Sequence, residues 1–114
     1  MYLVARQAFA LLAVSTLATA AYTAETGLTL QQGDIFTNDV GTVMAVSVVN
    51  GTANTVGSVA VNCAFTAGGK AVGSAGTTIY NVVAGEKGQD QVHLMGAKAD
   101  AASCTITSTT APAN

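Results

Sequence analysis

Positive charge is scarce in this chain of 114 residues, which has four lysines and arginines together and one histidine. Arg6 lies near the N-terminus, so the rest of the chain has three scattered lysines against six carboxylates. Binding to nucleic acid, or to an anionic membrane surface, needs a cluster of positive side chains. The composition therefore argues against nucleic acid and against charge-driven membrane binding as functions of this protein.

Side chains suited to catalysis are also scarce. His93 is the only histidine, and nothing in the sequence places a nucleophile and an orienting carboxylate beside it. His93 and Met95 share a strand face and, with Met44, would offer soft ligands to copper, but a specific metal site normally needs three or four convergent donors. Asp34 and Asp39 occur where turns are expected, and Asp is common in turns because it bonds the local backbone. We therefore predict no enzyme activity, no cofactor and no metal site.

Cysteine occurs twice, at Cys63 and Cys104, and tryptophan not at all. An even number of cysteines in an exported chain predicts one disulfide, and two buried free thiols are the alternative. Both cysteines fall at inward positions of predicted strands, as a disulfide in the core of a β-domain requires. We expect a Cys63–Cys104 bond with no tryptophan packed on it.

The N-terminus has the features of a secretory signal. Arg6 supplies a positive charge, Ala8–Ala20 is an apolar run of 13 residues, and Ala18 and Ala20 are the small residues that a signal peptidase reads. The run is shorter than the about 20 residues that span a bilayer, although a retained N-terminal anchor is the alternative. We expect cleavage after Ala20 or Ala21, export to the periplasm or the outside, and no membrane insertion of the mature protein.

Short apolar segments alternate with turn residues over the rest of the chain, at intervals of roughly 8–12 residues, as in β-sandwiches and barrels. In the two clearest segments, every second residue is apolar and predicted to face a core. These residues are Met44, Val46 and Val48 in one segment and Val59, Val61, Cys63 and Phe65 in the other. The expected strands are Leu28–Gln32, Thr42–Val49, Ser58–Thr66, Ala71–Gly73, Thr77–Val83, Gln91–Met95 and Ser103–Thr107, with a turn at Gly33-Asp34 and a hairpin turn at Ala67–Lys70.

The strand pattern predicts one domain. About six to seven strands with one disulfide fit an all-β, immunoglobulin-like β-sandwich, which we place at residues 21–108. A signal-peptide helix over residues 1–20 precedes it, and a disordered tail over residues 109–114 follows it.

Four short motifs follow one another in the second half of the chain. They are Val48-Val49-Asn50, Val59–Phe65 (VAVNCAF), Gly69–Gly73 (GKAVG) and Val82–Glu86 (VVAGE). From about Gly41 to Val92 the chain thereby resembles small exported bacterial domains of the FxLYD type. Phe65-Thr66 stands where that family has Tyr-Asp, and Ala84 where it has Pro. The resemblance implies a β-sandwich associated with the cell envelope and carries no catalytic residues.

These observations lead to one expected function and one alternative. We expect a non-catalytic module that binds an unknown envelope or surface protein, through an edge strand or a loop cluster. The alternative is a pilin-like structural subunit of a surface assembly, which the low charge of the chain also suits. Pilin-like subunits leave a groove that a neighbouring subunit fills with its N-terminal strand. The sequence leaves the oligomeric state open.

Overall fold

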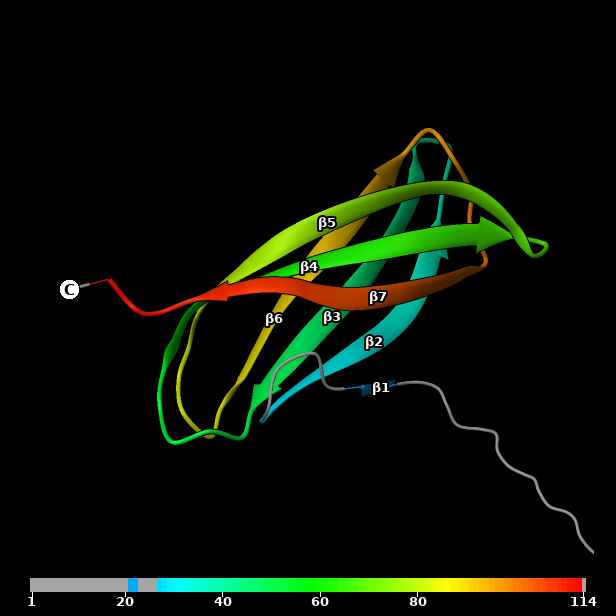
Figure 1. Ribbon diagram of the computed structural model, residues 1–114. Coiled ribbons are helices and arrows are strands. Elements are labelled where there is room, and N and C mark those ends of the chain that lie inside the picture. Colours follow the sequence, from blue (N-terminus) through cyan, green and yellow to red (C-terminus); the bar gives the residue numbers. More distant parts are fainter. Residues whose placement is uncertain (1–20, 23–26, 114) are drawn as a thin grey trace, which may run out of the picture.

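The computed structural model describes residues 21–22 and 27–113, so the predicted signal peptide lies outside the described residues. These residues form two antiparallel sheets, with strand orders β1-β2-β3-β6 and β5-β4-β7 (Figure 1). The strands are β1 (Ala21–Tyr22), β2 (Leu28–Thr37), β3 (Gly41–Asn50), β4 (Val56–Ala67), β5 (Lys70–Val82), β6 (Lys87–Met95) and β7 (Ala101–Thr110). No helix in this part of the chain is long and apolar enough to cross a membrane.

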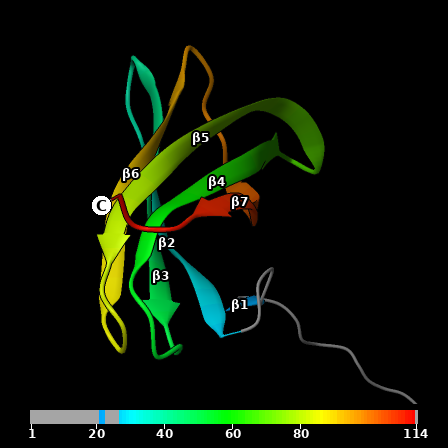
Figure 2. The same ribbon diagram turned by 60° about the vertical axis from the view of Figure 1, so that its left-hand side comes forward.

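The two sheets face each other across one apolar core (Figures 1 and 2). The middle strands β3 and β4 alternate between buried and more exposed residues, which confirms the predicted alternation. Their inward residues are Met44, Val46, Val48, Val59, Val61, Cys63 and Phe65, each at most 2% exposed. The neighbouring strands add Leu28, Leu30, Ile79, Val82, Val92, Leu94, Cys104 and Ile106. The predicted all-β fold is therefore confirmed.

Two predicted breaks are absent because glycine there serves close packing between strands. Gly33 and Asp34 form a bulge inside one continuous β2, where the register with β3 shifts, and not the predicted turn. The predicted strands Ala71–Gly73 and Thr77–Val83 are likewise parts of one long β5. A Cβ on Gly76 would lie 2.6 Å from the Val61 carbonyl oxygen of β4, so only glycine lets the two strands run this close.

The chain reaches both sheets through three crossing connections. The β4–β5 hairpin turns at Gly68 and Gly69, with φ of 57° and 82°, which confirms the predicted turn. The connections β3–β4, β5–β6 and β6–β7 pass from one sheet to the other. Along one side of the molecule β5 contacts β6, so the sheets are closed there (Figure 2).

The last strand is longer than expected. Thr109 and Thr110, which we assigned to the tail, belong to β7 and pair with β4. The chain then passes directly over Gly57, where any Cβ would collide with the carbonyl of Ala111. The C-terminal segment Ala111–Ala113 therefore lies against the end of β4, and hollows form beside it at that end of the molecule.

Candidate functional site

The outer edge of β7 is the first candidate site. β7 is the end strand of its sheet and pairs only with β4 among the described strands. The side chain of Gln32, on β2, meets this edge with two hydrogen bonds. Its Nε2 donates to the Ala102 carbonyl oxygen at 2.8 Å, and its Oε1 accepts from the Cys104 N–H at 2.9 Å. One amide side chain thus makes the pair of bonds that a neighbouring strand would make with its backbone.

The residues of β7 leave this edge without the usual protection. Natural edge strands commonly carry charged side chains or proline, which prevent pairing with another chain. β7 reads AASCTITSTT and has neither. β6, which is one of the two end strands of the other sheet, carries Lys87, Asp90 and His93 and contacts β5. Of β6 and β7, β7 is therefore the edge that is open to a further strand.

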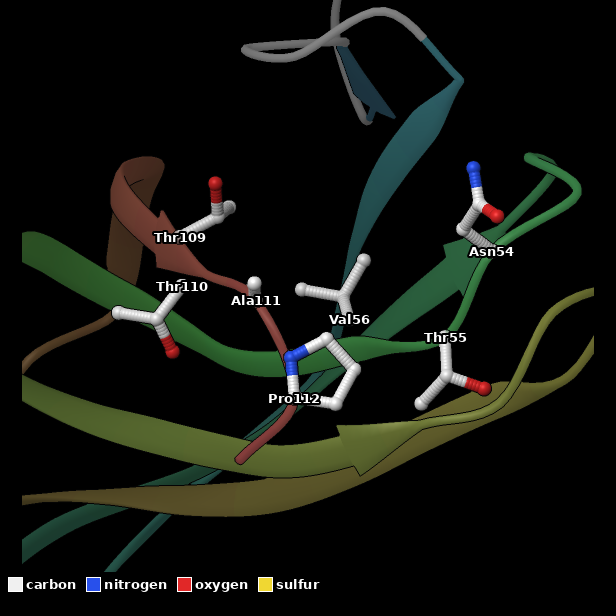
Figure 3. A pocket seen from close by; sticks show the side chains of 7 residues that line it. All are labelled: Asn54, Thr55, Val56, Thr109, Thr110, Ala111 and Pro112. Carbon is white, nitrogen blue, oxygen red and sulfur yellow. The ribbon is translucent and has the colours of Figure 1, made fainter. Parts of the chain in front are cut away.

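A hollow of about 520 Å³ lies at the end of β7, between that strand and the β3–β4 connection (Figure 3). Figure 3 shows Val56 in the middle of the hollow, with Thr109 on one side and Asn54 on the other. The complete lining is Asn54, Thr55, Val56, Thr109, Thr110, Ala111 and Pro112. The lining has no charged side chain, so the hollow suits an uncharged or apolar group.

Asn50 holds the connection that forms one wall of this hollow. The residue is fully buried, and its Nδ2 donates to the carbonyl oxygens of Asn54 at 2.8 Å and Val82 at 2.9 Å. Its Oδ1 accepts from the N–H of Thr52 at 3.0 Å and from the Thr52 hydroxyl at 2.7 Å. Both donors and both acceptor positions of the amide are used. The β3–β4 connection is thus tied to the end of β5.

The same contacts make a glycosylation motif inaccessible in the folded protein. Asn50-Gly51-Thr52 has the spacing of an acceptor site for an N-linked glycan. A glycan attaches to Nδ2, which here is buried and donates two hydrogen bonds. The folded protein therefore cannot accept a glycan at this position. In the sequence, Asn50 is marked by this motif and by the Val48-Val49-Asn50 motif of the family resemblance, and neither indicates its buried hydrogen bonds.

The predicted disulfide is present, between Cys63 of β4 and Cys104 of β7. The two residues are directly opposed in the antiparallel ladder, with their Cα atoms 4.0 Å apart. Both are fully buried. The bond therefore joins neighbouring strands within one sheet and fixes the edge strand to the middle strand.

The copper hypothesis is wrong for these residues because its three ligands lie on different sides of a sheet. Met44 is fully buried in the core, whereas Met95 is 67% exposed and His93 is exposed with it on the other face of β6. The register places Val43, and not Met44, opposite His93. Within the part of the chain that the structure describes, no three His, Cys, Asp or Glu side chains form a metal-binding group.

The same end of the four-stranded sheet carries an apolar cluster that the sequence analysis missed. Phe36, Val40 and Met95 are 68%, 57% and 67% exposed. Val43 of β3 lies opposite Phe36 of β2 on one side and opposite His93 of β6 on the other, so Phe36, Val43 and His93 form a row across three strands. Strand pairing brings them together, and no local motif marks the cluster.

The carboxylate of Asp90 makes a pH-dependent contact. The Thr77 hydroxyl donates to its Oδ2 at 2.6 Å and the Gln91 N–H donates to its Oδ1 at 2.8 Å. These two hydrogen bonds hold the pKa of Asp90 below the ordinary 3.8, against the opposing effect of burial, and His93 adds the smallest contribution. Ionised Asp90 thus stabilises the fold above about pH 4, and this stability is lost as the pH falls through the lowered pKa. We expect Thr77→Val to raise the pKa of Asp90 toward 3.8 in a carboxyl NMR titration.

Thr78→Val is the matched control for that titration, because no hydrogen bond joins the Thr78 hydroxyl to Asp90 among the described contacts. It should leave the pKa of Asp90 unchanged. Equal titration curves for the wild-type protein and Thr77→Val would contradict the assignment of the hydroxyl as the main cause.

The described residues therefore bring together an uncharged strand edge, a side-chain amide that covers part of it, and a hollow at its end. Cys63 and Cys104, the two residues singled out from the sequence, hold this edge in place and form no reactive centre. Gln32 and Asn50 complete the site. No protein-family model, curated protein or solved structure matches the chain.

Proposed function

We propose that the chain is a non-catalytic protein-binding module of the bacterial cell envelope, and that its partner adds an extended strand to the outer edge of β7. The observation that carries this proposal is the β7 edge, where Gln32 takes the hydrogen bonds of a neighbouring strand. The apolar run before residue 21 and the disulfide support an exported location. Two facing sheets and one disulfide support an immunoglobulin-like sandwich of the FxLYD type.

The chemistry of the edge favours a polypeptide as the partner. The Cys104 N–H and the Ala102 carbonyl point away from β4, and in an antiparallel ladder alternate residues of a strand face the same side. Ile106 therefore presents its backbone to this side as well. An extended chain offers donors and acceptors at the same spacing. In the complex, its backbone replaces the Gln32 amide.

The burial of the core favours a module over a pilin-like subunit. A pilin-like subunit needs a donated strand to complete its core. Here the core residues nearest to the β2–β7 side are already buried, with Leu28, Leu30 and Ile106 only 3%, 2% and 8% exposed. An added strand would thus extend the sheet through its backbone and would not fill a groove. We expect discrete complexes with a partner and not long self-assembled polymers.

Site-specific photo-crosslinking in the native host tests the proposal. A photoreactive residue in place of Thr105, on the outward face of β7, should form an adduct with a partner protein. Thr78 is the control position, because it lies on the same face at the opposite edge of the sheet, two strands away. Strand addition at β7 predicts adducts from position 105 and none from position 78.

Adding Ala102→Pro to the protein that carries the photoreactive residue at position 105 makes this test more specific. The backbone N–H and carbonyl of Ala102 face the outer edge, so proline removes an edge donor and leaves the hydrogen bonds with β4 intact. Its ring also occupies the place of an incoming strand. We expect loss of the adduct with an unchanged circular dichroism spectrum. Adducts of equal yield from both positions, or an adduct that survives Ala102→Pro, would refute binding at this edge.

A further inference from the structure

A second hollow, of about 330 Å³, lies on the outward face of the three-stranded sheet, on the other side of the C-terminal segment. Its lining is Gly57, Ser58, Tyr80, Asn81, Thr110, Ala111 and Ala113. The lining has one aromatic ring, one amide and two hydroxyl groups besides the phenol, and no charged side chain. Its volume is at the lower end of the range of about 300–1,000 Å³ for small-molecule sites.

Three of these residues form a row across the whole sheet. Ser58 of β4 is opposite Tyr80 of β5 on one side and opposite Thr110 of β7 on the other. The Ser58 and Thr110 hydroxyl oxygens are 2.7 Å apart and share a hydrogen bond, and Tyr80 is 70% exposed. Since neighbouring strands lie about 4.8 Å apart, the row from ring to hydroxyl spans about 10 Å.

The backbone of Asn81 brings its amide to the same surface. Asn81 has a φ of 54°, a left-handed conformation that is uncommon for residues other than glycine. In a regular strand, Asn81 would point into the core after the outward Tyr80. Here Ile79 and Val82 are buried, and Tyr80 and Asn81 are both exposed. The irregularity thus places an aromatic ring and an amide side by side on the outer face.

We propose that this hollow binds a neutral carbohydrate of one or two sugar rings. The Tyr80 ring offers a flat apolar surface for the C–H face of a sugar, and the Asn81 amide and the Ser58–Thr110 hydroxyl pair offer hydrogen bonds to sugar hydroxyls. An acidic or basic sugar finds no opposite charge in the lining. A peptide strand is disfavoured here because the backbones of β4 and β5 already pair with each other. The hollow shares Thr110 and Ala111 with the hollow at the end of β7, but it lies on the outward face of the sheet and does not rest on the proposed function.

An NMR titration of the full chain tests this site. The neutral probes are cellobiose and di-N-acetylchitobiose, and the charged probe is digalacturonate, so that each probe has two sugar rings. We expect at least one neutral probe to shift the amide signals of Ser58, Tyr80, Asn81 and Thr110, and digalacturonate to leave them in place. Tyr80→Ala should weaken the neutral sugar about tenfold, in the range for loss of one stacked aromatic ring.

Phe36→Ala is the matched control, because Phe36 is an equally exposed aromatic residue, at 68%, on the other sheet. It should leave the affinity for the sugar unchanged. Tyr80 is exposed, so its replacement leaves the core intact, and an otherwise unchanged spectrum verifies this. The proposal is overturned if neither neutral sugar shifts these four amides, if Tyr80→Ala binds as well as the wild-type protein, or if a peptide probe shifts them and the sugars do not.

Discussion

Replacing Cys63 and Cys104 together by alanine should lower the free energy of unfolding by about 4 kcal/mol. The bond closes a loop over a sequence separation of 41 residues, and without it the unfolded chain gains the corresponding conformational freedom. A domain of this size has a net stability of only about 5–15 kcal/mol. The variant should therefore unfold at a much lower urea concentration, as followed by circular dichroism.

Reduction of the wild-type protein separates two contributions to its stability, that of the covalent bond and that of the packing of the sulfur atoms. Both sulfurs lie in the core, so alanine also removes apolar contacts there. Wild-type protein with reductant present in the urea keeps those sulfurs and loses only the bond. It should show most of the 4 kcal/mol loss. A loss below about 1 kcal/mol would mean that the bond does not constrain the unfolded chain as the entropy model requires.

Replacing Asn50 by leucine, which has the same branched shape but no polar atoms, should lower the free energy of unfolding by about 4 kcal/mol through lost hydrogen bonds. The change leaves the Val82 carbonyl oxygen and the Thr52 N–H without their partner, whereas the Asn54 carbonyl oxygen keeps the Thr52 hydroxyl as a donor at 2.9 Å. An unsatisfied buried polar group costs about 1–3 kcal/mol, and only part of this is recovered where water reaches the loop. Hydrogen exchange of the Thr52 amide should become faster, because its N–H loses the Asn50 side-chain oxygen. The Gly85 amide, which donates to the backbone carbonyl oxygen of residue 50, keeps its partner and should change less.

Asn62→Leu is the matched control for this variant. Asn62 is also an asparagine in a strand, but it is exposed on the outer face of β4, and no side-chain hydrogen bond involves it among the described contacts. Its replacement should change the free energy of unfolding by no more than about 0.5 kcal/mol. Equal losses for the two variants would show that the Asn50 amide has no special role and that leucine is simply poorly accepted in these strands.

The sequence was sufficient for those parts of the fold in which burial alone decides the pattern. Strands β3 and β4 lie in the middle of their sheets, so each has one fully buried face, and alternation of apolar residues located both. The cysteines were found for the same reason, since each occupies a buried position of this alternation. The end strands have less buried surface, and their boundaries were predicted less well.

Glycine was misinterpreted where its role depends on a neighbouring strand. Gly33 and Gly76 look like turn residues in the sequence, yet each lies inside a strand that runs close to another backbone. Asn81 interrupts the alternation of β5 because its own backbone is left-handed. Asparagine tolerates this conformation, but its presence in a sequence does not predict it.

Gln32 and Tyr80 became candidates only through contacts made across the fold. Gln32 bonds to residues of β7 that lie 70 and 72 positions away, and Tyr80 meets Thr110 across β4. Such sites depend on strand order and register. Periodicity along the chain specifies neither of them.

The position of the disulfide has a mechanical consequence for a protein that binds through β7. Tension on a strand bound at this edge would peel β7 from β4 one hydrogen bond at a time, starting at Thr110. The covalent bond at Cys104 stops this peeling and passes the load to Cys63, in the middle strand of the sheet. The same pull on β6 would meet hydrogen bonds only. If a partner binds at β7 as proposed, its load therefore falls on the edge strand that a covalent bond joins to the middle of its sheet.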